Sequence, residues 1–551
     1  MLCDLNECLN CLRLWWLPFS LTESTKPKYR GGGLRCVEVA GRNITKYDVG
    51  LLAIILIGLF LRVYHLQTQS IWFDEAFSVF ESKMSLPQLV ETVASVENSP
   101  PLYFVFLHYW MMIFGSSESA VRFLSALFGV LAIPVFYLVG RQLFNEEVGL
   151  LSAFILAISS FNIWYSQETR MYTLMVLLVL LSMYCLLRLL QHSTLAWSAG
   201  YVLSTALLVY THFYGLFVLL AQNIYIISLV LSKNRTFKLR HWIVLQATVL
   251  ALFIPWVVVS NQISRRLGTT ATLAVPTTAD FIYAFSVYSG TIVLLALFLV
   301  LSVLSLFGYQ KVRGKMDWKA PLKALERYSW EVHLQNISPV YFLSVWLLTI
   351  NLIPFIISRF SSSIYLERYT IAASVALYLL VAKGIHSINN RYAKIVVIGL
   401  VAVLSVANLS VYYTSITKPQ AREAISYIDA NLKSGDVVLV SHGQSVVFDY
   451  YNNRTDAVVS PLHSWAVVGN ATNSSATPSV KDKINEIQSD VSGHGRVWLF
   501  ATNFITGKAA ENFTLSILNE SYANIYTKTY LGARSGSTAY GYDVYLFEKR
   551  M

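Results

Sequence analysis

Long apolar segments recur along most of this chain and constrain its fold more than any other feature. The core of a lipid bilayer is roughly 30 Å thick, so a helix that crosses it needs about 20 apolar residues. Such segments lie at 48–66, 119–140, 148–165, 171–190, 196–213, 214–231, 241–259, 281–308, 339–358, 369–388 and 393–413. Because 55% of the residues are hydrophobic and only 13% are charged, the sequence predicts a polytopic α-helical membrane protein with about eleven spans. The first segment lacks a small-residue cleavage site, so we expect it to remain as a signal anchor.

The apolar segment 100–115 is ambiguous, because its length suits either a span or a helix at the membrane interface. If it does not cross and the N-terminus is cytoplasmic, the basic residues within 233–240, 311–323 and 383–394 all lie inside, as positively charged loops normally do. We therefore expect a juxtamembrane helix there. The segments placed on the outer face of the cell membrane are then 67–118, 166–170, 260–280, 359–368 and everything after 414. The formal charge of +11 is explained by these topology signals, not by nucleic-acid binding.

This topology divides the chain into three regions. Residues 1–47 are expected to be a cytoplasmic extension, and residues 48–413 the membrane domain. After 414, an amphipathic helix, a turn at 434–436 and a buried strand predict an extracytoplasmic α/β domain. That domain has no glycine-rich phosphate loop, so no cofactor is assigned to it. The extension contains Cys3, Cys8, Cys11 and Cys36, whose spacing superficially matches an iron–sulfur pattern but for which we expect no joint task.

The stretch "SIWFDEAFSVF" (70–80) follows the first span and places Asp74 and Glu75 side by side among aromatic residues. A helix over 71–82 puts Asp74, Ser78 and Glu81 on one stripe. Its other stripe consists of Phe73, Phe77 and Phe80. The sequence thus predicts an interfacial helix with an acidic upper face. That face could bind substrate, or it could simply be solvated.

Further ionisable groups lie at other joints predicted on the same side. The stretch "WYSQETRMY" places Glu168 and Arg170 between two spans, either as a site or as a helix-capping pair. His212, in "YTHFYG", is a candidate ligand contact or a hydrogen-bonded anchor. Arg368, in "LERY", could meet an anion or reach the interface by snorkelling. The remaining candidate substrate contacts are His108, Tyr172 and Tyr369.

Acids, guanidinium groups and aromatic rings on one membrane side suit the transfer of a sugar from a lipid phosphate. A carboxylate can take the proton of an acceptor hydroxyl, and we assign this general-base role to Asp74. Glu75 and Glu168 are expected to orient the acceptor or a metal. Arg170 and Arg368 are expected to pair with phosphate, whose oxygens match the planar guanidinium group. A divalent metal is possible with several acids in one cavity, but no ligand spacing establishes one.

The sequence resembles the GT-C membrane glycosyltransferases, in particular the branch of protein O-mannosyltransferases, aminoarabinose transferases and Rgt-type lipopolysaccharide glycosyltransferases. The resemblance rests on "WFDEAFS", "NSPPLYFVFLHYWMMIFG" and "SQETRMYTL", covers about the first 230 residues well, and weakens toward "ERY" at 367–369. It implies a polyprenyl- or dolichyl-phosphate-linked monosaccharide donor, an acceptor on the outer leaflet and inversion at the anomeric carbon. It also implies that Asp74 is the first-loop acid, with Glu75 beside it, that Glu168 is the second-site acid, and that Arg368 meets the donor phosphate.

Departures from the family narrow the acceptor, which the resemblance leaves as a glycan, a lipid or a protein. The C-terminal region differs from the β-trefoil insert of eukaryotic O-mannosyltransferases, which puts a protein Ser/Thr acceptor in doubt. The WWDYG motif of oligosaccharyltransferases is absent, which argues against transfer of a whole oligosaccharide to Asn.

Two other function classes compete with this interpretation. A transporter or lipid flippase would also carry charges near apolar spans, but it often has internal repeats and interrupted helices, and the sequence indicates neither. A sensory or binding module on a membrane anchor would not need so many spans.

Overall fold

The computed structural model describes residues 38–39, 42–43, 45–96, 99–232, 239–267, 273–306, 337–441, 443–454, 458–462, 480–502, 505–532, 534–535, 538–539 and 541–550. Residues 47–551 form one compact unit and residues 1–46 another. In the smaller unit, β1 (Glu38–Val39) pairs antiparallel with β2 (Arg42–Asn43). The four cysteines of the N-terminal extension lie outside the described residues.

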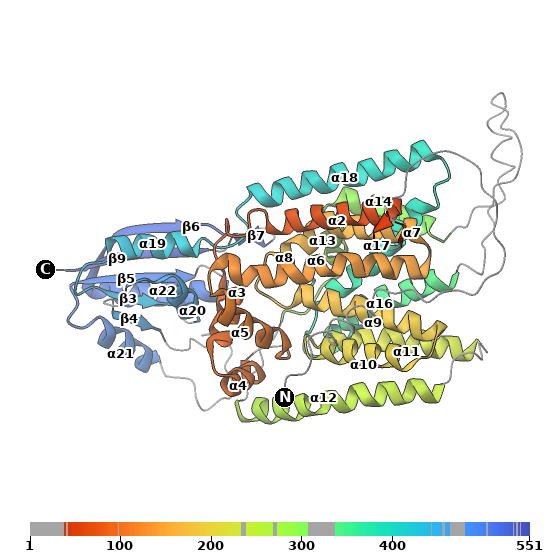
Figure 1. Cartoon of the computed structure of the whole chain (residues 1–551). Helices are drawn as coiled ribbons and strands as arrows, with labels where there is room; N and C mark the ends of the chain where they lie inside the picture. Colours follow the sequence, from red (N-terminus) through yellow and green to blue (C-terminus); the bar gives the residue numbers. More distant parts are fainter. Residues whose placement is uncertain are drawn as a thin grey trace, which may run out of the picture. The chain divides into compact units, whose positions relative to one another are not determined.

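Helices occupy every segment predicted to span the membrane (Figure 1). They are α2 (Lys46–Val63), α6 (Glu118–Leu143), α7 (Glu146–Ile158), α8 (Ser160–Ser166), α9 (Tyr172–Gln191), α10 (Leu195–Val209), α11 (Gly215–Leu231), α12 (Leu239–Leu267), α13 (Thr278–Ser289), α14 (Ile292–Leu304), α16 (Ile337–Phe360), α17 (Ile371–His386) and α18 (Arg391–Thr414). Within the described ranges, 5 helices are long and apolar enough to cross a membrane, or up to 7 if each bent pair is one span. The helical membrane fold is therefore confirmed, whereas the predicted count of about eleven spans is not reached by this criterion.

Two of the predicted spans are not continuous helices, which corrects the expectation that no helix is interrupted. The segment 148–165 breaks between α7 and α8 with a bend of 59°, and 281–308 breaks between α13 and α14 with a bend of 87°. Ser159 ends α7, and its side chain accepts a hydrogen bond from the Asn162 amide to start α8. Gly290 has φ = +90°, a conformation that other residues rarely adopt. Apolar periodicity carries no signal for either break.

The side chain of Arg62 compensates for the break between α7 and α8. Arg62 is fully buried at the end of α2. Its guanidinium group donates to the carbonyl oxygens of Ala157 at 3.2 Å and of Leu156 at 3.1 Å. These carbonyls belong to the last turn of α7, where the helix no longer supplies amide donors. A cation with several donors thus takes the place of the missing helical hydrogen bonds.

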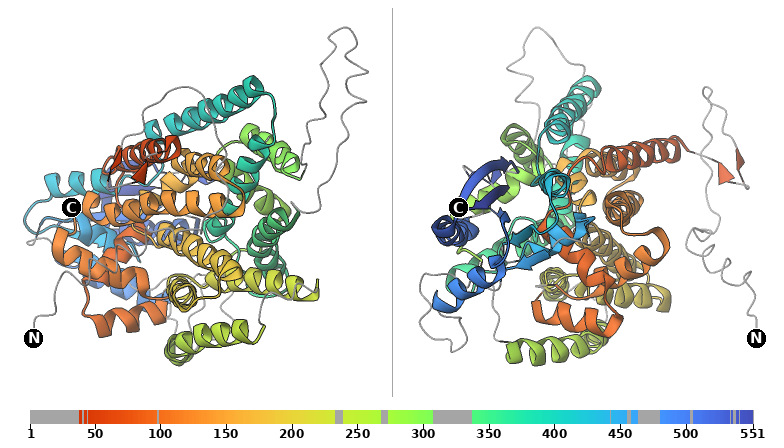
Figure 2. Two further views of the ribbon diagram at one scale, coloured as in Figure 1. Left: turned by 45° about the vertical axis from the view of Figure 1, so that its right-hand side comes forward. Right: turned by 90° about the vertical axis from the view of Figure 1, so that its left-hand side faces the viewer.

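The helices pack around α9 and α17, which are mostly buried, whereas α12 and α18 are largely exposed. Figures 1 and 2 show α12 and α18 on opposite sides of the bundle. Neighbouring helices α6 and α7 approach closely where Gly140 faces Gly149. A Cβ atom on Gly140 would lie 2.8 Å from the Gly149 Cα, so this contact requires glycine.

Three short helices follow α2: α3 (Phe73–Lys83), α4 (Leu86–Val96) and α5 (Leu102–Phe114). Helix α5 has 13 residues, about 20 Å at 1.5 Å per residue, which is shorter than a bilayer core. The acidic face of α3 is mostly buried, which disagrees with the alternative that this face is simply solvated. Glu75, Ser78 and Glu81 are buried within the protein, whereas Phe80 is 43% exposed. Ion pairs of Glu75 with Arg122 and Lys418, described below, compensate for the burial of this carboxylate.

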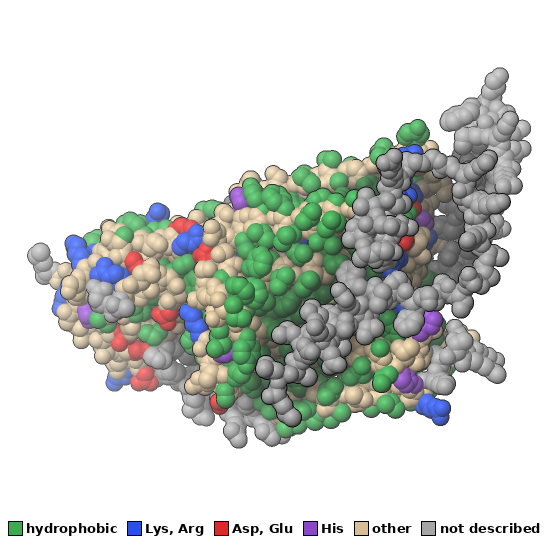
Figure 3. Space-filling model, viewed as in Figure 1, with side chains coloured by type: hydrophobic (Ala, Val, Ile, Leu, Met, Phe, Trp, Pro, Cys, Tyr) green, Lys and Arg blue, Asp and Glu red, His purple; other side chains and the backbone are tan. Residues whose placement is uncertain are grey.

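The C-terminal region contains a five-stranded sheet with the order β4-β3-β5-β9-β6. Its strands are β3 (Val437–Val440), β4 (Val458–Pro461), β5 (Arg496–Thr502), β6 (Tyr522–Tyr530) and β9 (Tyr542–Lys549). Strand β3 runs parallel to β4 and β5, whereas β9 is antiparallel to β5 and β6. The helices of this region are α19 (Ala421–Asn431), α20 (Ser445–Tyr451), α21 (Val480–Val491) and α22 (Ile505–Ser521), and a small separate pair is formed by β7 (Arg534–Ser535) and β8 (Thr538–Ala539). In Figure 3, hydrophobic side chains gather over the helices and charged ones over the sheet region.

Candidate active site

The start of α3 is anchored by the C-terminal region. The amide of Ile71 donates to the Tyr451 hydroxyl at 2.6 Å, and the Ser70 hydroxyl donates to Glu423 at 2.8 Å. Trp72 is the N-cap residue, so Asp74 and Glu75 fall in the first helical turn. A helix N-terminus stabilises negative charge there.

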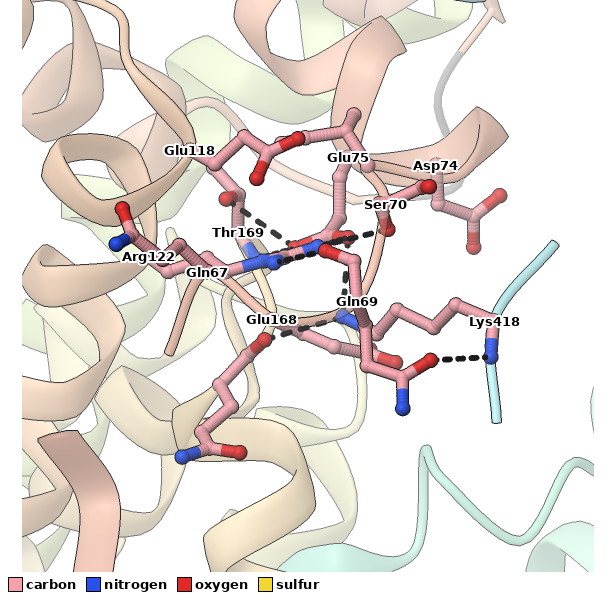
Figure 4. A network of polar contacts seen from close by, with 12 residues as sticks. Gln67, Gln69, Ser70, Asp74, Glu75, Glu118, Arg122, Glu168, Thr169 and Lys418 are labelled. Atoms are coloured by element: carbon pink, nitrogen blue, oxygen red, sulfur yellow. Dashed lines mark hydrogen bonds and ion pairs between the residues drawn. The ribbon is translucent and has the colours of Figure 1, made fainter. Parts of the chain in front are cut away.

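The carboxylate of Glu75 is the centre of a buried ionic network (Figure 4). Arg122 on α6 donates to both of its oxygens, at 2.8 and 2.7 Å. Lys418, which follows α18, donates to it at 3.0 Å, and the Thr169 amide does so at 3.0 Å. This network joins α3, α6, the 166–170 joint and the segment after 414. Two of these segments, the 166–170 joint and the chain after 414, were predicted to share the outer face with α3.

The network leaves the Glu75 carboxylate charged and inaccessible. Burial alone would raise the pKa of Glu75, but the nearby charges of Arg122 and Lys418 lower it to about 2. Its side chain is 0% exposed, which does not fit the expectation that Glu75 orients an acceptor or a metal ion by direct contact. Its hydrogen bonds and ion pairs connect the first turn of α3 to α6, to Thr169 and to Lys418.

Asp74 points away from this network and pairs with a different cation. Its Oδ2 lies 3.1 Å from the Arg368 Nη1, and the two side chains are 18% and 24% exposed. The guanidinium group of Arg368 also lies 5.8 Å from the Trp72 ring centre and 5.7 Å from that of Tyr369. Burial alone would lower the pKa of Arg368, but the neighbouring Tyr172 hydroxyl and Asp74 carboxylate raise it. An accessible carboxylate and an accessible cation thus face each other among aromatic rings.

Buried polar atoms with unfilled hydrogen-bonding capacity surround this ion pair. Buried polar groups in proteins are normally paired. Those without a partner among the described residues near the pair include Trp72 Nε1, Glu168 Oε2, Tyr172 Oη, His212 Nε2 and Arg368 Nε. The rings connect them, since Tyr369 lies 4.9 Å from His212 and 6.5 Å from Tyr172. Such a set is suited to hydroxyl and phosphate groups of a ligand.

Glu168 and His212 are both held in environments that disfavour charge. Burial raises the pKa of Glu168, and its Oε1 accepts a hydrogen bond of 2.7 Å from Trp164. It does not form the capping pair with Arg170 that was the alternative interpretation. Burial, together with the charges of Arg170 and Arg368, lowers the pKa of His212 to about 3. Because its Nδ1 accepts from the Tyr214 amide at 3.1 Å, we assign the proton of the neutral ring to Nε2.

The other predicted site residues divide between this cluster and its surroundings. Tyr172 and Tyr369 are part of the cluster through their rings. Arg170 donates to Ser78 on α3 at 3.1 Å and lies over the Phe104 ring. His108 hydrogen-bonds the Ser82 carbonyl at 2.8 Å, toward the end of α3 opposite Asp74, and no described contact joins it to the cluster. Among the described residues, no group of three or more His, Cys, Asp or Glu could hold a metal ion.

Sequence reasoning missed Arg122 and Lys418, which hold the site together. Arg122 is an arginine in an apolar helix, and this costly placement is the signal that also drew attention to Glu168. Lys418 comes just after the last span, outside any apolar segment, so its position in the sequence does not mark it as unusual. Its partner is more than three hundred residues away in the chain, and only the fold brings the two together.

Comparisons with known proteins agree with this architecture. Residues 98–259 match the model of a family described as dolichyl-phosphate-mannose-protein mannosyltransferase. The structure is similar to ArnT from Cupriavidus metallidurans in the apo state, with a TM-score of 0.55, 13% identity and coverage of 91% of this chain and 97% of that one. For the same protein bound to undecaprenyl phosphate, the TM-score is 0.52, the identity 11% and the coverage 91% and 98%. No curated protein sequence matches the chain.

An archaeal oligosaccharyltransferase shares the fold as well. AglB from Archaeoglobus fulgidus, in complex with an inhibitory peptide and a dolichol-phosphate, has a TM-score of 0.50 and 13% identity, and the match covers 90% of this chain and 74% of that one. ArnT and AglB are both GT-C glycosyltransferases. The chain therefore has the GT-C fold, and the resemblance read from its sequence is confirmed at the level of the fold.

Proposed function

We propose that this protein transfers a monosaccharide from a polyprenyl-phosphate-linked donor to an acceptor hydroxyl on the outer face of the cell membrane. The observation that carries the proposal is the pair of Asp74 and Arg368, 3.1 Å apart and surrounded by buried polar atoms that have no partner among the described residues. Two proteins of the same fold are bound to undecaprenyl phosphate and to a dolichol-phosphate. A lipid-phosphate donor is consistent with both findings.

The two members of the pair have opposite tasks in this reaction. Arg368 pairs with the donor phosphate, and its departure from Asp74 leaves the carboxylate free to accept a proton. As Asp74 takes the proton of the acceptor hydroxyl, the acceptor oxygen bonds to the anomeric carbon. The bond from that carbon to the phosphate oxygen breaks, and its electron pair stays on the polyprenyl phosphate beside Arg368. A single displacement of this kind inverts the anomeric configuration.

The groups around the pair would orient the sugar. Neutral His212 offers an N–H donor at Nε2, and Tyr172 offers a free hydroxyl. Glu168, whose pKa is raised by burial, can donate from its protonated form or accept from a sugar hydroxyl. Aromatic rings such as those of Trp72 and Tyr369 can stack on a sugar face.

The decisive experiment incubates purified protein with a panel of polyprenyl-phosphate sugars and candidate acceptors, and follows donor consumption and product mass. We expect Asp74→Asn to lower turnover by about 10²–10⁴-fold, the usual contribution of a general base, while the protein remains folded in the membrane. Asp449→Asn, at an exposed aspartate of α20, serves as the matched control and should leave turnover unchanged.

Two outcomes would contradict the proposal. Full activity of the Asp74→Asn variant would show that Asp74 is not the general base. Movement of a lipid or solute across vesicles, without formation of any glycosidic bond, would instead favour the transporter or flippase class.

A further inference from the structure

An apolar groove lies between the end of α2, the end of α5 and the start of α6, apart from the site of Asp74 and Arg368. Its volume is about 730 Å³. Its wall is formed by Leu66, Trp110, Phe114 and Phe123, and Trp110 is held in place by a hydrogen bond of 2.8 Å to the Ala120 carbonyl. The adjoining end of α5 is strongly exposed, with Met112 at 72% and Ile113 at 73%. Apolar surface this exposed on a membrane protein is normally covered by lipid.

A polar pocket with a volume of about 450 Å³ adjoins this groove. The two share Gln67 as a lining residue, and Glu118 in the pocket is followed directly by Ser119 in the groove. The basic residues that line the pocket are Lys83, at the end of α3, and Arg422, on α19. An apolar groove beside a pocket with two basic residues has the form expected for an amphiphile with an anionic head group.

The charges of the pocket leave one positive group available. Arg422 and Glu118 neutralise each other, with their nearest atoms 2.6 Å apart, and Tyr451 also donates to Glu118. Lys83 is exposed, and within the described residues it has no acidic partner. The first turn of α6, whose N-cap is Ser117, adds the partial positive charge of a helix N-terminus.

We propose that the groove and pocket together bind one anionic glycerophospholipid of the bilayer, with an acyl chain in the groove and the phosphate beside Lys83. The position of the pocket argues against the donor lipid as the occupant. Lys83 lies about 13 Å along α3 from Asp74, at 1.5 Å per residue. The buried network of Glu75, Arg122 and Lys418 occupies the adjoining face of α3, whereas Asp74 pairs with Arg368.

Native mass spectrometry of the full-length purified protein, without any sugar donor, tests this inference. The probes are phosphatidylglycerol and phosphatidylcholine with identical acyl chains. We expect one phosphatidylglycerol to be retained in preference to phosphatidylcholine. Lys83→Gln should weaken its retention about fivefold, the effect of one basic residue near an anionic head group. Lys481→Gln, an exposed lysine on α21, is the matched control and should change nothing.

A second variant tests the groove independently of charge. Ser119→Trp fills the groove and should reduce retention of both lipids, with the melting temperature checked to show that the protein is folded. Equal retention of the two lipids, or unchanged retention by Lys83→Gln, would overturn the inference. In a separate titration of the lipid-bound protein, displacement of the lipid by inorganic phosphate or by a polyprenyl-phosphate sugar would also overturn the inference, since either would assign the pocket to another ligand. None of these measurements requires glycosyltransfer, so their outcome does not depend on whether the proposed function is correct.

Discussion

Two adjacent acids on α3 show how burial assigns different roles to similar side chains. Asp74 is 18% exposed and faces Arg368, whereas Glu75 is enclosed by Arg122, Lys418 and Thr169. The exposed acid can exchange its partner for a substrate. The enclosed one would leave two buried cations without a counter-charge if it moved, and unpaired buried charge is costly.

Arg368 is expected to act on the donor. Arg368→Gln should lower kcat/KM for the donor by about 10²-fold, because a charge-assisted, bidentate contact with phosphate is lost. Arg368→Lys keeps the positive charge but loses the paired donors of the planar guanidinium group. Its kcat/KM for the donor should therefore lie between those of Arg368→Gln and the wild type. Steady-state kinetics at a series of donor concentrations measure this kcat/KM. Arg359→Gln, at the exposed end of α16, is the control, and an equal loss there would show that the effect is not local.

The lowered pKa of His212 predicts that the stability of the protein depends on pH. Its folded-state pKa is lowered to about 3, whereas an unperturbed histidine has a pKa of about 6.5. Between these values the unfolded chain binds a proton that the folded protein does not, so His212 makes stability fall as pH falls from about 6.5 toward 3. The loss is about 1.4 kcal/mol per pH unit within this window.

Melting temperatures of the wild type and His212→Gln between pH 7 and 5 test this expectation. Glutamine can still accept the Tyr214 amide bond but does not titrate, so the variant should show a shallower decline. Other groups contribute equally to both proteins and cancel in the comparison. Parallel curves would exclude His212 as a source of the dependence, and His192→Gln at an exposed histidine should match the wild type.

At the level of elements, the bundle depends on how it stabilises its two broken helices. Arg62 supplies donors to carbonyl oxygens at the end of α7. Arg62→Leu should lower the free energy of unfolding by about 2–4 kcal/mol, because two buried acceptors lose their partners. Thermal melting in detergent measures this. Arg141→Leu, at an exposed arginine of α6, should cost much less, and similar losses would refute the special role of Arg62.

The second break depends on Gly290. A Cβ atom there would lie 2.5 Å from Asn408 Nδ2 and 2.8 Å from Ser160 Oγ, with the backbone at φ = +90°. Gly290→Ala should therefore destabilise the protein by about 1–3 kcal/mol. Gly399 in α18 has nothing within 4 Å of its Cβ position, so Gly399→Ala should be neutral or slightly stabilising. Equal melting temperatures for the two variants would contradict this account of the bend.

On the scale of the whole molecule, the contact between Glu75 and Lys418 connects α3 to the chain beyond the last helix of the bundle. Both side chains are almost fully buried and lie 3.0 Å apart. In a double-mutant cycle with Glu75→Gln and Lys418→Met, we expect a coupling energy of about 2–3 kcal/mol, measured from unfolding. The same cycle on the part-exposed pair of Glu147 and Lys394 should give less than about 1 kcal/mol. Equal couplings would mean that the buried pair does not unite the two regions.

Most of the helical architecture follows from the sequence alone, because lipid demands long apolar segments whose backbone groups bond internally. The chain also shows, from its ionisable residues at span ends, where a site could form. Asp74, Glu168 and Arg368 were predicted for this reason. The bends at Ser159 and Gly290 were not, since a bend leaves the apolar composition of a segment unchanged.

Only the tertiary structure decides which charged side chains form ion pairs with each other. Asp74 and Glu75 are neighbours in sequence, yet one faces Arg368 and the other faces Arg122 and Lys418. Local periodicity assigns a residue to a face of its own helix, whereas its partner comes from a segment whose position depends on the packing of the entire bundle. Burial, and with it the cost of leaving a charge unpaired, exists only once that packing is complete.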